Sequence, residues 1–188
     1  MPSPFDARLA AIELLEDPTL ARESDDLRGP VDPDTIRRFQ PRSGLRLPPA
    51  FRDWLCCHNG GLIGTQVACG LGTDAAWEVE ATLQMEPRWT HRGWIPVGAD
   101  GNGDYYLAAS ASSREPEGLV FFVDQMDFSV PDYVVGSDMW HFLYGLACQE
   151  LRSEEWWPFE RDRMLEVDPA LATVASALLP WDEEGLPR

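Results

Sequence analysis

Apolar residues recur at helical spacing near the start of the chain. In residues 4–16, PFDARLAAIELLE, they follow one another every three or four positions, which predicts an amphipathic helix that Pro18 ends. Residues 17–33 are acidic and contain prolines, which is typical of a linker. A short helix is then opened by Asp34 and stopped by Pro41.

The segment LPPAFRDWLCCHNGG contains the clearest helix of the chain. Pro49 stands where the first turn of a helix accepts proline. One face of this helix carries Phe51, Trp54, Leu55 and His58. We expect Asn59, Gly60 and Gly61 to end the helix, because glycine readily takes the left-handed backbone conformation of a helix cap.

The middle of the chain changes to shorter apolar stretches. Residues 62–69 predict a strand, and residues 74–89 predict a helix with apolar contacts at Trp77, Leu83 and Met85. Four more strands are predicted at residues 93–98, 104–110, 118–124 and 132–137. Turn residues separate each neighbouring pair, so we expect these strands to form an antiparallel meander.

Helical spacing returns after the last strand. Ser137 and Asp138 offer N-caps for a helix over residues 139–151. Its apolar stripe consists of Trp140, Leu143, Tyr144 and Ala147. A further helical stretch is predicted around residues 169–179. Helices, then a compact antiparallel sheet, then helices again are typical of an α+β fold and not of alternating βαβ units.

This order divides the chain into three expected parts. Residues 1–32 form an N-terminal helix and linker, residues 33–150 form one α+β domain, and residues 151–188 form an acidic C-terminal extension. A length of 188 residues suits one domain with additions at its ends. No apolar run reaches the roughly 18 residues of a membrane span, and the N-terminus lacks the pattern of a signal peptide.

The charge of the chain narrows the class of partner. Acidic residues number 32 against 15 basic residues, all of them arginine, and the net charge is −17. We expect no direct binding to DNA or RNA, because the phosphate backbone is negative too. A basic protein would be attracted over about 8 Å at physiological salt. An acidic surface that only keeps the protein soluble would explain the same charge.

The cysteines and histidines show no metal-site pattern. Cys56 and Cys57 are adjacent, no CxxC pair exists, and the three histidines are scattered. Cys56, Cys57 and Cys148 lie in apolar helical patterns, so we expect buried thiols. We therefore predict no metal and no cofactor. Reduced cysteines without an export signal favour the cytoplasm.

The stretch GADGNGDYYL raises the question of an ion site. Asp100, Asn102 and Asp104 alternate as the first ligands of a calcium loop do. Such a loop needs glycine at its sixth position and glutamate at its twelfth, where this chain has Tyr105 and Ala111. A phosphate cradle is not favoured either, since neither GK[ST] nor a helix follows the glycines.

We interpret this stretch as a turn between two strands. Gly101 and Gly103 can adopt positive φ. Asp104 is expected to accept hydrogen bonds from nearby backbone amides. Tyr105 and Tyr106 are expected to point to opposite faces of the following strand.

Three segments, LRLPPAFRDWLCCHNGG, WIPVGADGNGDYYLAAS and GLVFFVDQ, together resemble the SUKH superfamily over about residues 33–150. This group includes bacterial immunity proteins from polymorphic toxin systems and fungal regulators of cell-wall assembly. The most specific positions of the first segment are Leu47, Pro48, Phe51, Asn59, Gly60 and Gly61. Those of the second segment are Ile95, Pro96, Gly98, Gly103, Asp104, Tyr105 and Tyr106.

The resemblance implies a single α+β domain with helices packed around an antiparallel sheet, and it implies no catalysis. In bacteria it implies an intracellular protein that binds a cognate toxin, often a nuclease with a basic surface that an acidic protein could occupy. A regulatory or scaffolding module without a toxin partner is the alternative. An enzyme is a third reading: the chain has no GxSxG elbow, but a hydrolase that uses Asp100 and Asp104 stays open.

Acidic residues are the candidate partner contacts. Residues 100–138 carry eight acids and one arginine, and residues 150–188 carry ten acids and four arginines. We predict contacts on the loops of the sheet, at Asp124, Asp127, Asp100 and Asp104. The pair Trp156–Trp157 is a further candidate, either as an exposed aromatic contact or as a lid over the domain's own core.

Overall fold

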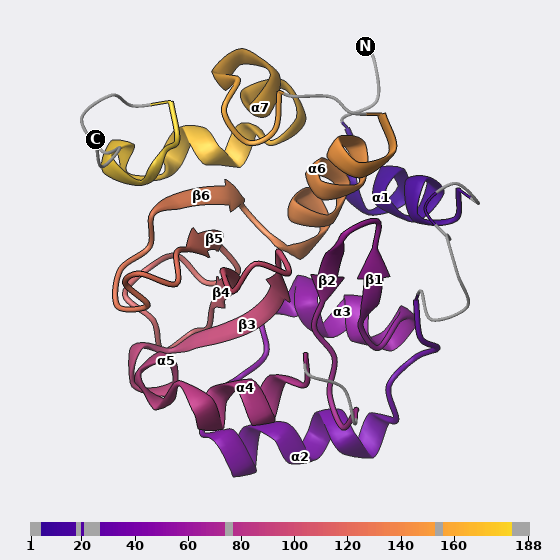
Figure 1. The fold of residues 1–188 in the computed structure, drawn as a ribbon, viewed down its shortest axis with the longest axis vertical. Helices are drawn as coiled ribbons and strands as arrows, with labels where there is room; N and C mark the ends of the chain where they lie inside the picture. The colour runs from indigo at the N-terminus through magenta and orange to yellow at the C-terminus, as the bar shows by residue number, and fades with distance from the viewer. Residues whose placement is uncertain (1–4, 18–19, 21–26, 74–76, 153–155, 182–188) are drawn as a thin grey trace.

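A six-stranded antiparallel sheet forms the centre of the protein (Figure 1). The computed structural model describes residues 5–17, 20, 27–73, 77–152 and 156–181. The strands are β1 (Gly61–Ile63), β2 (Gln66–Ala68), β3 (Trp94–Ala99), β4 (Tyr105–Ala109), β5 (Val120–Val123) and β6 (Tyr133–Gly136). Their order in the sheet is their order in the chain, so the predicted meander and the α+β class are confirmed.

Helices surround this sheet. They are α1 (Ala7–Leu15), α2 (Pro33–Ser43), α3 (Pro49–Cys57), α4 (Val79–Met85), α5 (Pro87–Arg92), α6 (Met139–Arg152) and α7 (Arg161–Val167), followed by the 3-10 helices η1 (Pro169–Thr173) and η2 (Ser176–Leu178). Figure 1 shows α1 beside α6, and the C-terminal helices above β6. The ion pair Arg42–Glu80, at 3.1 Å, joins α2 to α4.

Both faces of the sheet are covered. Tyr105 and Tyr106 point to opposite faces, as predicted. The Tyr105 ring lies 5.1 Å from the ring of Trp89 in α5, whereas the Tyr106 ring lies 4.8 Å from the ring of Phe142 in α6. The predicted helix at residues 139–151 is confirmed as α6, and its stripe is buried at Trp140, Leu143, Tyr144 and Ala147.

The prediction that Pro41 stops the second helix is wrong. Asp32 is the N-cap of α2, its side chain accepts a hydrogen bond from the Asp34 N–H, and the helix continues through Pro41. A proline so near the end of a helix removes only one backbone hydrogen bond, that to the carbonyl four residues earlier. The last turn still closes, because Gly44 takes φ 75° and its N–H bonds to the carbonyl of Gln40.

Two predicted elements are each divided. Residues 62–69 form the hairpin β1–β2 and not one strand, because Gly64 takes φ 60° and begins a two-residue turn. The predicted helix at 74–89 becomes α4 and α5, because Pro87 forces the preceding Glu86 out of the helical conformation. Residues 74–76 lie outside the described residues. Of the predicted apolar contacts in this segment, Leu83 is buried, Trp77 is half-buried and Met85 is exposed.

The glycines after α3 do not cap it. The helix ends at Cys57, and the C-cap His58 is extended, with φ −140°. Gly60 instead takes φ +74° and also lies very close to the end of β2: a Cβ there would lie 2.8 Å from the Ala68 carbonyl oxygen and 2.8 Å from the Gly70 nitrogen.

Asn59 reinforces this close approach. Its side-chain amide donates to the Leu71 carbonyl at 2.9 Å, and its side-chain oxygen accepts from the Leu71 N–H at 2.8 Å. Asn59 therefore fastens the chain that leaves β2, and Gly60 permits its close approach.

The cysteines and the C-terminal elements also depart from expectation. Cys148 is buried, but Cys56 is exposed and Cys57 half-buried, because α3 presents only one face to the core. The predicted helix at 169–179 is two short 3-10 turns, η1 and η2. The first predicted helix is present as α1, and Pro18, expected to end it, lies outside the described residues.

Candidate partner-binding surface

The turn before β4 is built by Asp100. Its Oδ1 accepts hydrogen bonds from the N–H groups of Asn102 at 2.7 Å and Asp104 at 3.2 Å. Gly101 and Gly103 take φ 82° and 114°, which suits a turn that residues with a Cβ rarely adopt. The interpretation of this stretch as a strand-connecting turn is confirmed.

A second acidic loop follows β5. The Asp124 Oδ1 accepts from the Met126 N–H at 2.6 Å, and the Asp127 Oδ1 accepts from the Ser129 N–H at 2.9 Å. Asp132 closes this loop at its far end, since its Oδ2 accepts from the Asp124 N–H at 2.7 Å. Each carboxylate thus uses at least one oxygen to fix the backbone of the loop.

Gln125 joins the two loops. Its N–H donates to the Asp104 Oδ1 at 2.8 Å, and its side-chain amide donates to the Asn102 carbonyl at 3.1 Å. Asp104 therefore bonds a backbone amide, as expected, but one that lies on the other loop. The result is one acidic loop surface, which we define as Asp100, Asp104, Asp124, Asp127 and Asp132.

Burial and neighbouring like charges raise the pKa of two carboxylates of this surface, whereas the hydrogen bonds from Ser129 lower the pKa of Asp127. Partial burial, together with the charges of Asp100 and Asp124, raises the pKa of Asp104 although the Gln125 N–H opposes this. Burial and the charges of Asp124 and Asp127 likewise raise the pKa of Asp132. A cation brought to this surface would relieve that repulsion.

The structure brings together all four predicted acidic contacts and adds two residues that the sequence analysis did not choose. Asp132 closes the loop, and Met126 stands at its tip with 89% of its surface exposed. The signal for Met126 was present in the sequence, as an apolar residue between two aspartates directly after a buried strand. An exposed methionine offers an adaptable apolar contact in the middle of a charged rim.

Residues 30–145 match the sequence profile of the SMI1 / KNR4 family (SUKH-1), and this match spans more than half of the chain. The chain belongs to the SMI1 / KNR4 family. No curated protein matches the chain. The acidic loop surface lies inside the SUKH-1 match, whereas α1 and α7 lie outside it.

The motif residues of the SUKH-1 domain shape its backbone. Pro96 lies in the central strand β3, where a proline is tolerated because the register shifts between Pro96 and Gly98. A Cβ at Gly98 would lie 2.7 Å from the Val67 carbonyl oxygen of β2, so this glycine permits close pairing of the strands. Leu47, Phe51 and Ile95 are buried in the core, and Pro48 is the N-cap of α3.

The expectation of an exposed Trp156–Trp157 pair is wrong. Both side chains are buried, with 8% and 4% of their surfaces exposed. The Trp157 indole N–H donates to the Val135 carbonyl of β6 at 3.0 Å, and its ring packs near those of Tyr106 and Phe142. The alternative reading, a lid over the domain's own core, describes this packing.

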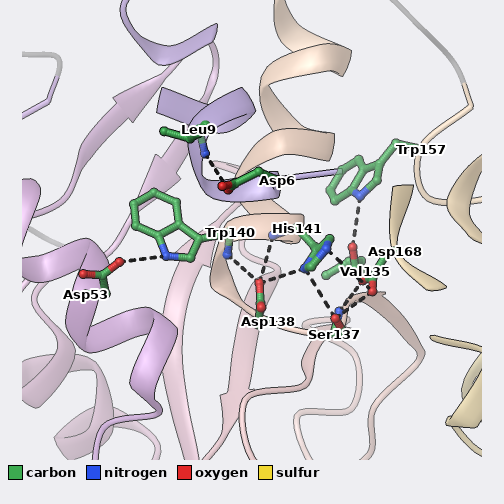
Figure 2. A network of polar contacts seen from close by, with 10 residues as sticks. All are labelled: Asp6, Leu9, Asp53, Val135, Ser137, Asp138, Trp140, His141, Trp157 and Asp168. Atoms are coloured by element: carbon green, nitrogen blue, oxygen red, sulfur yellow. Dashed lines mark hydrogen bonds and ion pairs between the residues drawn. The ribbon is translucent and has the colours of Figure 1, made fainter. Parts of the chain in front are cut away.

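A second polar cluster lies where α6 begins (Figure 2). The Asp138 Oδ1 accepts from the N–H groups of Trp140 and His141 at 2.9 and 3.0 Å, so Asp138 caps the helix. The Ser137 N–H and hydroxyl both donate to the buried Asp168 carboxylate, each at 2.7 Å. Ser137 thus ties the C-terminal residues to the SUKH-1 domain.

Serine, histidine and aspartate meet here, but not in the geometry of a nucleophile and its base. Such a relay needs one imidazole nitrogen facing the serine and the other facing the carboxylate. Here Ser137 and Asp138 both approach Nδ1 of His141, at 3.4 and 3.0 Å, and Nε2 lies 3.9 Å from Asp168, which is too far for a hydrogen bond. The serine hydroxyl donates to Asp168 and not to the imidazole, so no base faces its proton. The cluster is arranged to hold chain segments together.

Two further findings concern the described part of the chain only. No group of three or more His, Cys, Asp or Glu side chains in it is placed to hold a metal ion. None of its helices has the length and apolar character needed to cross a membrane.

Proposed function

We propose that this SUKH-1 protein is a non-enzymatic, cytoplasmic immunity-type protein that binds and neutralises a cognate toxin. The toxin would present a basic surface, as a nuclease does where it grips nucleic acid. The observation that carries the proposal is the acidic loop surface, because hydrogen bonds hold its five carboxylates close together on two joined loops.

Two physical properties support this use. The carboxylates are fixed before a partner arrives, so little conformational entropy is lost when they bind. The net charge of −17 also favours rapid association with a basic protein, and salt would weaken that attraction. Met126 at the loop tip would add an apolar contact that salt does not screen.

The family match alone fits an immunity protein and also a regulatory or scaffolding module without a toxin partner. Co-expression distinguishes the two. We expect the chain to restore growth of cells that express the toxin encoded beside its gene, and to bind the purified toxin domain. Failure to rescue and to bind that toxin would leave the scaffolding reading.

Charge variants then test the surface itself. Asparagine at Asp100, Asp124 and Asp127 removes three charges and keeps the acceptor oxygens that hold the loops. With each exposed ion pair worth about 0.2–1 kcal/mol, the triple variant should bind the toxin roughly tenfold more weakly and with a shallower salt dependence. The matched control removes three exposed charges elsewhere, at Glu13, Glu160 and Asp162. Equal weakening by both triples would show that net charge alone, and not this surface, directs binding.

A further inference from the structure

The C-terminal segment, residues 156–181, is fastened to the SUKH-1 domain at two polar points. Trp157 donates its indole N–H to the Val135 carbonyl of β6. Asp168, between α7 and η1, accepts the two hydrogen bonds from Ser137 described above. Asp168 is 1% exposed, and a carboxylate buried to that degree is costly unless hydrogen bonds or a cation compensate its charge.

His141 supplies the nearby cation. Its Nδ1 lies 3.0 Å from Asp138 at the start of α6, and its Nε2 lies 3.9 Å from Asp168 of the C-terminal segment. Figure 2 shows the imidazole between these two carboxylates. The other charged groups that face it are Asp6 and Arg8 on the α1 side, which border the same hollow of about 360 Å³.

We propose that His141 is a proton-operated latch for the C-terminal segment: its charged imidazole bridges Asp138 and the buried Asp168, and loss of the proton loosens residues 156–181 from β6. The bridge joins the family domain to residues outside the family match. Arg8 does not substitute for it, because the Arg8 guanidinium is paired with Asp53 of α3 at 2.8 Å.

The direction of the pH response follows from the charges. Burial lowers the pKa of His141, but the hydrogen bond to Asp138 and the charges of Asp168 and Asp138 outweigh this, so the pKa lies above its ordinary value near 6.5. The stabilisation is therefore complete below about pH 6.5 and is lost as the pH rises through the raised pKa of the folded state. Burial opposes ionisation of Asp138, but the hydrogen bond and charge of His141 hold the pKa of Asp138 below its ordinary value. Asp138 therefore keeps its charge until the pH falls through that lowered pKa, and only in such acid is the bridge lost by protonation of Asp138.

Release of the segment would uncover a strand edge. β6 is the last strand of the sheet, so one of its edges pairs with no other strand among the described residues. Trp157 covers part of that edge through its bond to Val135, and its ring covers the aromatic pair Tyr106 and Phe142. An uncovered edge beside apolar rings is a surface to which another extended chain can add.

Two measurements on the full chain test the latch. NMR titration of the His141 ring should give a pKa above 6.5, and that value should fall in Asp168→Asn. Hydrogen exchange should show that the protection factors of amides in residues 156–178 fall several-fold between pH 6 and pH 8.5, while amides of β3 and β4 keep theirs. Protection factors are compared because they remove the intrinsic pH dependence of exchange.

His141→Gln is the decisive variant, because it keeps a hydrogen-bonding side chain and removes the charge. We expect its C-terminal segment to be weakly protected at both pH values. His91→Gln, at an exposed histidine, is the matched control and should behave as the wild type. A His141 pKa at or below 6.5, or the same pH-dependent loss of protection in His141→Gln, would overturn the proposal.

Discussion

The close approach of β2 to the residues after α3 leads to a quantitative test at Gly60. Gly60→Ala would place a Cβ 2.8 Å from both the Ala68 carbonyl oxygen and the Gly70 nitrogen. Both are backbone atoms held by strand pairing and by the Asn59 clamp, so neither can move aside as a flexible side chain would. The substitution must therefore shift the backbone or strain the contact between Gly60 and the end of β2.

Gly44 provides a matched control. Its φ of +75° is almost that of Gly60, +74°, but a Cβ there would have no atom within 4 Å. An alanine in the left-handed conformation costs about 1–2 kcal/mol at either position. Overpacking adds about 1–3 kcal/mol at Gly60 alone. The smaller unfolded-state effect of replacing glycine is common to both variants and cancels in the comparison.

Urea unfolding followed by tryptophan fluorescence measures the difference. We expect Gly60→Ala to lose about 1–3 kcal/mol more free energy of unfolding than Gly44→Ala. The m-value, which is the slope of that free energy against urea concentration, should be the same for both variants. That loss would be a large fraction of the roughly 5–15 kcal/mol that stabilises a typical domain. Equal losses, within about 0.5 kcal/mol, would refute the argument that close approach of β2 requires this glycine.

Substitutions at three further positions test other contacts. Asn59→Ala leaves the N–H and the carbonyl of Leu71 without their partners, and calorimetry should show a destabilisation of about 1–3 kcal/mol. Trp157→Phe keeps most of the apolar ring but loses the bond to Val135, so hydrogen exchange of the C-terminal segment should accelerate more than that of the central sheet. Asp104→Asn keeps the acceptor for the neighbouring loop and removes a crowded charge, so its free energy of unfolding at pH 7 should not fall, whereas Asp104→Ala should be less stable in the same assay.

Elements with a long, uniform pattern were predictable from the sequence. The strands β3 to β6 and the helix α6 follow apolar stretches bounded by turn residues, and these patterns dominate local alternatives. The wrong predictions lie where a single residue determines the local backbone conformation. Gly64 turns a predicted strand into a hairpin, and Pro87 divides a predicted helix, because turn chemistry at a single position overrides the average pattern around it.

The acidic loop surface was predictable in its residues but not in its construction. The contact between the Gln125 N–H and Asp104 spans 21 positions and follows from strand register, since Tyr105 pairs with Val123. Knowing the register would have placed the two loops side by side. The burial of Trp157 had no such signal, because its contacts with β6 and α6 depend on how the C-terminal segment returns to the domain.

The strand order has a consequence for synthesis on the ribosome. Each strand pairs with the strand made just before it, so the sheet can assemble hairpin by hairpin as the chain emerges. β6 must then wait with a bare edge until α6 and the indole that covers it have left the exit tunnel. A pause in translation shortly after β6 would expose a nascent chain with an uncovered strand edge, which is prone to pair with its neighbours on the same message.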